Sequence, residues 1–283
     1  MKKTSLIAFA EESIKISEKG SYVSASGKQV NIAKEQRQSV ENSILYSPED
    51  FKALFEKRDT LIQDKTPYNT VLEVKNETVL ESIARISSEA SNEKIFVLNF
   101  ASAKNPCGGF LNGAKAQEES IARSSGLHPS LMKHFKMYEI NRGLTSCLYT
   151  DYMIYSPLVP VFRNDEGKLL DIPLQASILT SPAVNAGVVR RQGTQEEIDA
   201  INDTMLARTE KVLSVALVHG YEYLILGAWG CGVFQNIPMD IANFFKFHLT
   251  ENPSFKGMFK KVAFAVYDMP YGNSIHAFQK VFG

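Results

Sequence analysis

Two neighbouring glutamates, Glu118 and Glu119, follow a short loop that contains Gly108 and Gly109. The apolar run at residues 95–98 is typical of a buried strand, and the glutamates open a helix-like segment. A strand, a glycine loop and a helix start place backbone N–H groups where they can face an anionic ligand. Carboxyl groups beside such a loop are suited to acid–base chemistry. The competing interpretation is an ordinary tight turn before a helix whose first turn favours acids.

The two glutamates are expected to do different jobs, because adjacent residues on a helix point about 100° apart. A general acid that works near neutral pH needs a raised pKa. Burial and a second carboxylate nearby are two ordinary causes of such a shift.

A second glycine loop, residues 227–234, follows another short apolar run, residues 223–226. Ligands of open α/β sheets lie at the carboxyl ends of the strands, and both loops fit that position. Neither loop matches a dinucleotide-binding or Walker glycine pattern. The competing interpretation treats Val233 and Phe234 as core residues that end the loop. Trp229 is expected to be a structural residue rather than a ligand-binding one.

Alternating strands and helices must position the two loops. Apolar spacing predicts helices over residues 3–19, 48–62, 77–88, 129–137, 195–219, 238–249 and 274–281. Apolar runs predict a hairpin over residues 22–32 and strands over residues 70–74, 94–99, 152–155, 158–162, 176–179, 223–226 and 262–266. From residue 70 onward this alternation favours an α/β sheet with helices on both faces.

The composition is that of a globular protein without a charge bias. The 283 residues include 31 basic and 31 acidic side chains, which argues against a general nucleic-acid surface. The three scattered cysteines form neither a disulfide framework nor a zinc-ligand spacing. No stretch is apolar enough for a signal peptide or a membrane span. We therefore expect a cytoplasmic protein that uses no metal or other cofactor and binds no membrane.

Both loops resemble the signature of microbial poly(ADP-ribose) glycohydrolases, in which a glycine triplet precedes Gln-Glu-Glu. Here Pro106-Cys107-Gly108-Gly109 is followed, after seven residues, by Gln117-Glu118-Glu119. The preceding NFASAKNP and the second loop, GAWGCGVF, are similar to the shorter microbial branch of that family. The chain departs from the signature at Cys107, which occupies the first glycine position of the triplet.

The resemblance implies an α/β fold of the macrodomain-like kind, an α/β/α sandwich with a mixed central sheet and helical N-terminal additions. Residues 1–65 would form a helical accessory segment packed on a catalytic core, residues 66–283. The implied activity is hydrolysis of the ribose–ribose O-glycosidic bonds of poly(ADP-ribose), mainly from chain ends, with release of ADP-ribose. The partner would be ADP-ribose polymer or ADP-ribosylated protein as substrate, and the protein is expected to be a monomer.

The resemblance also assigns roles to individual residues. Glu119 would be the catalytic acid, which then activates water as a carboxylate, while Glu118 would help to hold the ribose hydroxyls. The second loop would bind the diphosphate through backbone N–H groups. The implied substrate-binding residues are Asn105, Gly108, Gly109, Gln117, Ala228, Gly230, Cys231, Gly232, Val233 and Phe234.

Two other functions stay open. One is a binding module that recognises ADP-ribose without cleaving it, and Glu119 argues against this because such a module has no need of the acid. The other is a hydrolase on the same fold that removes ADP-ribose from a protein side chain or a nucleobase. Cys107 and residues 1–65 keep this second alternative open, because both could reshape the mouth of the pocket.

Overall fold

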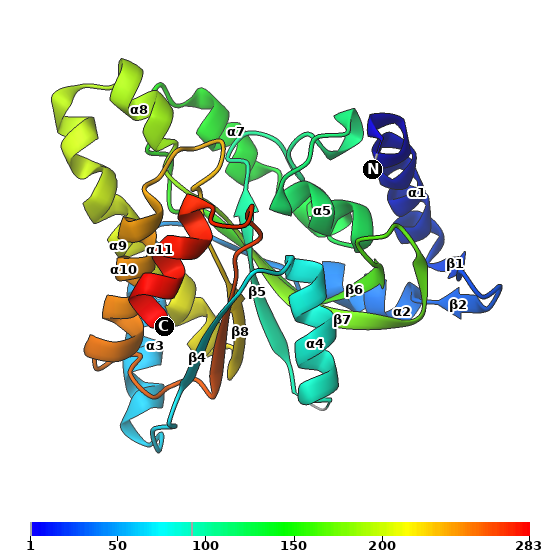
Figure 1. Cartoon of the computed structure of the whole chain (residues 1–283), viewed down its shortest axis with the longest axis horizontal. Helices are drawn as coiled ribbons and strands as arrows, with labels where there is room; N and C mark the ends of the chain where they lie inside the picture. The colour runs from blue at the N-terminus through cyan, green and yellow to red at the C-terminus, as the bar shows by residue number, and fades with distance from the viewer. Residues whose placement is uncertain (1, 92) are drawn as a thin grey trace. The chain divides into compact units, whose positions relative to one another are not determined.

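The computed structural model describes residues 2–91 and 93–283, which fall into two units (Figure 1). Unit 1 groups residues 2–45, 79–91, 93–142 and 153–181, and unit 2 groups residues 46–78, 143–152 and 182–283. The first glycine loop and the two glutamates belong to unit 1, and the second glycine loop belongs to unit 2. The expected boundary between an accessory segment, residues 1–65, and a catalytic core, residues 66–283, stays a prediction.

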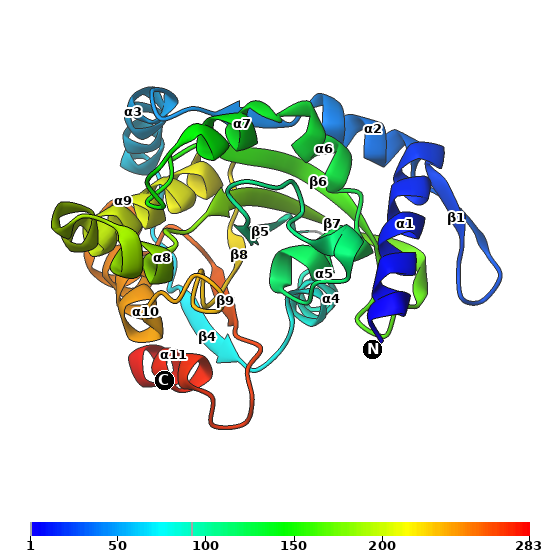
Figure 2. The same cartoon turned by 90° about the horizontal axis from the view of Figure 1, so that it is seen from above.

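Unit 1 contains a β-sheet with the strand order β3-β6-β7-β5 and a separate hairpin of β1 and β2. Its elements are α1 (Lys3–Lys19), β1 (Ser21–Val23), β2 (Gln29–Asn31), α2 (Ala33–Glu41), β3 (Ile44–Tyr46), α4 (Val79–Glu89), β5 (Ile95–Ala101), the 3-10 helix η1 (Phe110–Asn112), α5 (Gln117–Ser124), α6 (His128–Lys133), α7 (Lys136–Gly143), β6 (Met153–Arg163) and β7 (Leu169–Pro182). Helix α1 runs beside α5, and α2 lies against β6 (Figures 1 and 2).

Helix α1 follows from the spacing of its buried residues. Its buried residues Leu6, Ala10, Ser13 and Ser17 lie three or four positions apart, as expected for a helix with one buried face. The helix ends at Gly20, whose left-handed conformation (φ 68°) lets its N–H donate to the carbonyl of Ile16 at 2.8 Å.

Strand β5 leads directly into the first glycine loop. Its first five residues are all buried, as predicted for a strand covered on both faces. The strand therefore fixes the start of the loop within the core of unit 1.

Strand β6 passes through Pro157 and Pro160, where the sequence predicted two separate runs. That prediction was wrong, because the structure has one strand, paired antiparallel with β7. The pairing register shifts between Ser156 and Val159, and Leu158 there has a positive φ of 46°. Proline has no N–H to donate to a β-ladder, and a bulge is a place where a strand tolerates it.

Unit 2 contains three strands in the order β8-β9-β4, and β9 pairs parallel with both neighbours. Its elements are α3 (Asp50–Gln63), β4 (Val71–Lys75), α8 (Ala186–Gln192), α9 (Gln195–Val218), β8 (Tyr223–Leu226), α10 (Pro238–Lys246), the π-helix η2 (Phe247–Glu251), β9 (Lys261–Ala265) and α11 (Asn273–Phe282). Helix α9 packs on α3 and α10, and α10 packs on α11. Strand β8 is the element that leads into the second glycine loop.

Most of the predicted helices and strands are present, but α2, β3, α7 and α8 were not predicted. Helix α2 lacked an apolar stripe, because its buried residues are Gln36 and Ser39. Helix α3 begins at Asp50, two residues later than expected, and the N–H and hydroxyl of Ser47 both donate to the Asp50 carboxylate, at 2.7 and 2.8 Å. Among the described residues, no helix is long and apolar enough to cross a membrane.

The start of α9 gives a test of local stability. The Thr194 hydroxyl accepts a hydrogen bond from the Glu197 N–H at 3.2 Å, and the Glu197 carboxylate accepts one from the Thr194 N–H at 2.9 Å. We expect Thr194→Ala to lower the free energy of unfolding by about 1 kcal/mol, because it removes this capping hydroxyl. Urea denaturation measures the effect.

The matched control is Thr60→Ala, within α3. The Thr60 side chain is exposed, and its hydroxyl bonds to the carbonyl of Glu56 in the same helix at 3.0 Å. We expect this variant to change the free energy of unfolding by less than about 0.5 kcal/mol. Equal losses in the two variants would show that the cap does not stabilise the protein.

Candidate active site

The first turn of α5 is attached to β5 through the side chain of Gln117. The Gln117 amide N–H donates to the carbonyl of Leu98, and the Gln117 carbonyl oxygen accepts from the N–H of Phe100, both at 2.8 Å. The Gln117 side chain therefore makes one donated and one accepted hydrogen bond with the β5 backbone, as a neighbouring strand would. It holds the helix start, and with it the next two glutamates, against the end of the strand.

Glu118 is buried, with 3% of its surface exposed, and is held from two sides. One carboxyl oxygen accepts from the N–H of Ser102 at 2.7 Å, and the other accepts from the side-chain amide of Asn99 at 3.3 Å. Asn99 is itself oriented by a hydrogen bond to the Thr180 hydroxyl at 3.1 Å. Glu118 is therefore fixed by β5, β7 and the first residue of the loop.

Burial raises the pKa of Glu118 to about 8, and the charge of Glu119 contributes in the same direction. The hydrogen bonds from Ser102 and Asn99 lower the pKa but do not offset the loss of solvent. Glu118 is consequently protonated in most molecules at pH 7. A neutral carboxyl group at this position can donate as well as accept a hydrogen bond.

Glu119 faces the glycine loop. One of its carboxyl oxygens accepts from the N–H of Gly109 at 2.9 Å. The other oxygen is buried and has no hydrogen-bond partner among the residues that the structure describes. The two glutamates therefore have separate contacts, as the helical geometry predicted.

Gly108 allows this close approach. A Cβ atom at this position would lie 2.4 Å from the bonded Glu119 oxygen and 3.1 Å from a Glu118 oxygen. Gly108 also has a positive φ of 56°. Glycine is required here for space as well as for backbone conformation.

Cys107, at the first position of the triplet, has a left-handed φ of 59° and is fully buried. It thus adopts a conformation that favours glycine, at a cost of order 1 kcal/mol. Burial raises the pKa of its thiol well above the ordinary value, and the charges of Glu118 and Glu119 act in the same direction. The thiol stays protonated, which fits a residue that fills a tight turn.

Asn105 is placed at the outside of the loop. Its side chain is exposed, and its carbonyl oxygen accepts from the Arg142 guanidinium at 3.2 Å. The backbone N–H of Asn105 donates to the Ser102 hydroxyl at 3.1 Å. In the described part of the chain no hydrogen bond joins Asn105 to either glutamate.

The second glycine loop is tightly folded around Asn236. The Asn236 side-chain amide donates to the carbonyls of Val184 and Gly230, at 2.8 and 3.2 Å. Gly230 has a positive φ of 71°, and a Cβ there would lie 2.5 Å from the Asn236 amide nitrogen. The N–H of Cys231 donates to the carbonyl of Ala228 at 3.1 Å, so this amide is already engaged inside the loop.

The tip of this loop is more open. Val233 is 83% exposed, so it is not a core residue, and the half-buried Phe234 ring lies 6.1 Å from the ring of Tyr149. The N–H groups of Gly232, Val233 and Phe234 donate to no acceptor within the described residues. They are the donors that this loop can offer to an anion. Trp229, by contrast, is fully buried, as a structural residue would be.

Helix α8 supports the loop from within unit 2. The N–H of Gly187 donates to the carbonyl of Phe234 at 2.9 Å, and the Arg190 guanidinium donates to the carbonyl of Gln235, also at 2.9 Å. No pattern in the sequence indicated that Arg190 would contact the loop.

Sequence reasoning missed several residues that hold the glutamates. Asn99, Ser102 and Thr180 carry no motif of their own, and only Asn99 and Ser102 lie in the stretch that resembles the family. Tyr138 of α7 is also buried near this cluster, and its pKa is raised well above the ordinary value by burial and then by the charges of Glu118 and Cys107. No local pattern marks these residues, because their roles depend on how distant segments meet.

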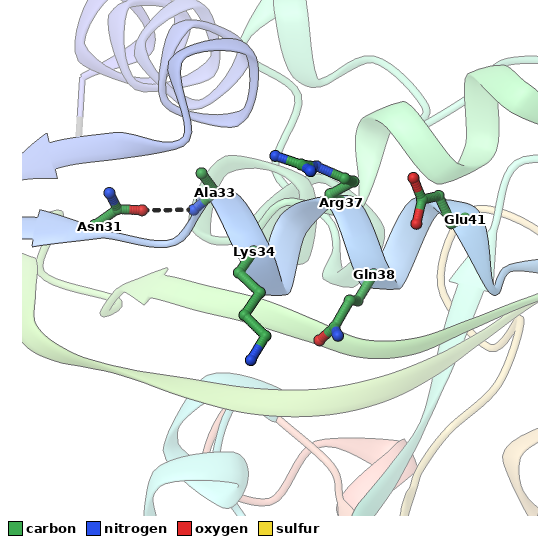
Figure 3. A pocket seen from close by; sticks show the side chains of 6 residues that line it. All are labelled: Asn31, Ala33, Lys34, Arg37, Gln38 and Glu41. Carbon is green, nitrogen blue, oxygen red and sulfur yellow. Dashed lines mark hydrogen bonds between the residues drawn. The ribbon is translucent and has the colours of Figure 1, made fainter.

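A surface hollow of about 390 Å³ lies on α2, away from the residues described above (Figure 3). Its lining residues are Asn31, Ala33, Lys34, Arg37, Gln38 and Glu41. Lys34 and Gln38 point to one side of the helix and Arg37 points to the other, and the charges are of both signs (Figure 3). The hollow includes no residue of α5 or of the glycine loops. Across the described residues, no group of three or more His, Cys, Asp or Glu could hold a metal ion.

Two buried carboxyl groups thus lie beside a glycine loop in an α/β unit, and comparison with known proteins identifies the family. Residues 10–164 match the family model described as the microbial-type PARG catalytic domain, where PARG is poly(ADP-ribose) glycohydrolase. This match spans more than half of the chain. No curated protein sequence gave a match.

Solved structures give the same result. The chain is 42% identical to poly(ADP-ribose) glycohydrolase from Thermomonospora curvata, with a TM-score of 0.91 and coverage of 99% of this chain and 100% of that one. The structure of that enzyme with the inhibitor ADP-HPD is 41% identical, with a TM-score of 0.87 and coverage of 98% and 99%. The enzyme from Deinococcus radiodurans in complex with ADP-ribose is 39% identical, with a TM-score of 0.81 and coverage of 89% and 98%.

The chain therefore belongs to the microbial-type poly(ADP-ribose) glycohydrolase family. The predicted α/β fold of the macrodomain-like kind is confirmed by the likeness to these structures. The prediction that the protein is a glycohydrolase enzyme is confirmed at the level of its family.

Gly108→Ala tests whether the loop must lack a side chain. We expect at least a 100-fold loss of poly(ADP-ribose) hydrolysis, because the new methyl group displaces the Glu119 carboxyl, and displacements of about 1 Å have effects of this size. ADP-ribose release, followed by chromatography, measures the loss.

The matched control is Gly27→Ala. Gly27 also has a positive φ, 88°, but a Cβ there would meet no atom within 4 Å. We expect a loss of stability of about 1 kcal/mol with normal activity. If both variants lost activity equally, crowding of Glu119 would not be the cause.

Glu118→Gln tests the raised pKa. Between the ordinary value of 4.5 and about 8, the folded protein keeps a proton on Glu118 that the unfolded chain has lost. The free energy of unfolding of the wild type should therefore fall as pH rises through this window, by up to about 1.4 kcal/mol per pH unit from this group. Glutamine mimics the neutral carboxyl group and removes this contribution.

Urea denaturation at pH 5, 7 and 9 measures the effect. The stability of Glu118→Gln relative to the wild type should rise from pH 5 to pH 8 and then level off. Glu139→Gln, a change at an exposed residue of α7, is the control. Parallel curves for the wild type and Glu118→Gln would contradict a protonated Glu118.

Proposed function

We propose that this protein hydrolyses the ribose–ribose O-glycosidic bonds of poly(ADP-ribose), mainly from chain ends, and releases ADP-ribose. The observation that carries the proposal is the arrangement of Glu119. The residue is 8% exposed, and one of its carboxyl oxygens is bound to Gly109 while the other has no partner in the described part of the chain. A buried polar atom without a partner needs an explanation, and a bond to substrate supplies one.

Glu119 acts first as an acid and then as a base. Its carboxyl group gives a proton to the leaving ribose oxygen as the bond from that oxygen to C1″ breaks. The sugar passes through an oxocarbenium-like ion. The Glu119 carboxylate then takes a proton from water, whose oxygen forms the new bond to C1″, and the acid is restored.

Glu118 has a different role. Glycosidases usually use two carboxyl groups, one of them charged and able to act as nucleophile or base. Glu118 is neutral in most molecules at pH 7, since its pKa is about 8. We assign it to holding the ribose hydroxyls by hydrogen bonds, while Gln117 fixes the helix start that carries both glutamates.

The remaining binding roles are also proposals. Gly108 and Gly109 let the substrate approach the backbone, and Asn105 borders the loop. In unit 2, the loop residues proposed to bind diphosphate and ribose are Ala228, Gly230, Cys231, Gly232, Val233 and Phe234. The open N–H groups at the tip of that loop support this assignment. A monomeric state and a cytoplasmic location are proposed as well.

Glu119→Gln is the decisive variant, because glutamine keeps the shape but cannot give a proton. We expect roughly a 1,000-fold loss of ADP-ribose release from polymer, within the usual range for a general acid. Calorimetry should give an ADP-ribose affinity within about threefold of wild type, since the other contacts remain. Glu139→Gln serves again as the control at an exposed glutamate.

The alternatives predict other results. Wild type and variant that are equally inactive, yet bind ADP-ribose tightly, would indicate a binding module. Faster cleavage of single ADP-ribose units from protein than of polymer would indicate the other hydrolase. A Glu119→Gln variant with full activity would contradict the assigned acid.

A further inference from the structure

Helix α1 contacts both ends of residues 113–123, the segment that carries Glu118 and Glu119. In Figures 1 and 2, α1 runs alongside α5, and it also packs on η1 in the first glycine loop. The sequence predicted only an accessory role for this helix. In the structure, this helix contacts the segment at two defined points.

The first contact is at Gly113, where the glycine loop ends. Gly113 has a positive φ of 72°, and a Cβ there would lie 2.8 Å from Cγ of Lys3, 3.0 Å from the carbonyl oxygen of Lys3 and 3.4 Å from Ile7. The backbone of the loop therefore rests directly on the first turns of α1.

The second contact is at the carbonyl of Arg123, in the last turn of α5. The Ser13 hydroxyl of α1 donates to this carbonyl at 2.5 Å, and the Arg163 guanidinium of β6 donates to it as well. Arg163 also donates to the Ser13 oxygen at 2.8 Å and to the carbonyl of Phe9 at 3.1 Å. One buried cation thus joins α1 to the C-terminal end of α5.

Charge favours this arrangement. The C-terminal end of a helix carries partial negative charge, so a cation there is stabilising. Burial lowers the pKa of Arg163, and the Glu12 carboxylate, to which it donates at 2.5 Å, offsets part of that cost. The guanidinium carbon also lies 4.8 Å from the centre of the Phe9 ring. Glu12 and Phe9 are both residues of α1.

The side chain of Arg123 bonds back to the start of the same segment. Its guanidinium donates to the carbonyl of Ala114 at 2.8 Å, so the start and the end of residues 114–123 are joined. Glu119 lies inside this closed segment, and its charge acts on the Arg123 guanidinium. A shift of α5 relative to α1 would therefore move Glu119 relative to the Gly109 N–H.

We propose that α1 is a positioning element of the active site, and that Ser13 and Arg163 are positioning residues. They hold α5 by the Arg123 carbonyl and so set the distance between Glu119 and Gly109. This inference rests on the proposed role of Glu119 as the acid.

Ser13→Ala tests the inference with a matched control on the same helix. The control is Ser17→Ala, because the hydroxyl of the buried Ser17 bonds only to the Ser13 carbonyl within α1, at 2.9 Å. We expect Ser13→Ala to lower kcat roughly 10-fold with KM changed less than about twofold, since a displaced acid affects the chemical step more than binding. Ser17→Ala should keep wild-type kcat at a similar loss of Tm.

Ser13→Thr is the conservative variant, because it keeps a hydroxyl at the same position. It should restore at least half of the wild-type kcat. Wild-type kcat in Ser13→Ala would overturn the proposal, as would equal losses of kcat in the Ser13→Ala and Ser17→Ala variants, which would indicate general destabilisation.

Glu119→Gln separates this proposal from the one on which it rests. If Glu119→Gln is inactive and Ser13→Ala has normal kcat, only the positioning role fails. If Glu119→Gln is active, the assigned acid is wrong, and the positioning role fails with it.

Discussion

The site depends on one hydrogen bond, from the N–H of Gly109 to the Glu119 carboxyl group. At this position the neighbouring residue must lack a Cβ, because a Cβ on Gly108 would lie 2.4 Å from the bonded Glu119 oxygen. The bond fixes one carboxyl oxygen, while the other is buried without a hydrogen-bond partner in the described part of the chain. Two other contacts in unit 1 hold the helix that carries Glu119: the Gln117 side chain bonds to β5, and Arg163 donates to the Arg123 carbonyl at the C-terminal end of α5.

Two buried carboxyl groups next to each other would be costly if both were charged. Burial raises the pKa of Glu118 to about 8, which reduces that cost at neutral pH. The hydrogen bonds from Ser102 and Asn99 orient Glu118 without being strong enough to ionise it. Burial and a second carboxylate were the two causes of a raised pKa expected from the sequence, and for Glu118 burial is the larger of the two.

The parts of the structure that a sequence can predict are the local ones. The glycine loop and the Gln-Glu-Glu start lie within a dozen residues of each other, so spacing alone placed them on adjacent elements. Thr180 and Arg163 could not be found this way, because each comes from a distant strand and depends on the packing of β6 and β7. Helix α2 escaped prediction for another reason, since Gln36 and Ser39 form its buried face and leave no apolar period.

The glycine signature itself combines two physical requirements that the sequence does not separate. Cys107 shows that a left-handed backbone alone can be tolerated with a side chain, at φ 59°. Gly108 has almost the same φ, 56°, but its missing Cβ leaves room for the Glu119 oxygen. The first position of the triplet therefore demands a conformation, and the second demands empty space. This difference explains how the chain departs from the family pattern at Cys107 while the hydrogen bond from Gly109 to Glu119 is kept.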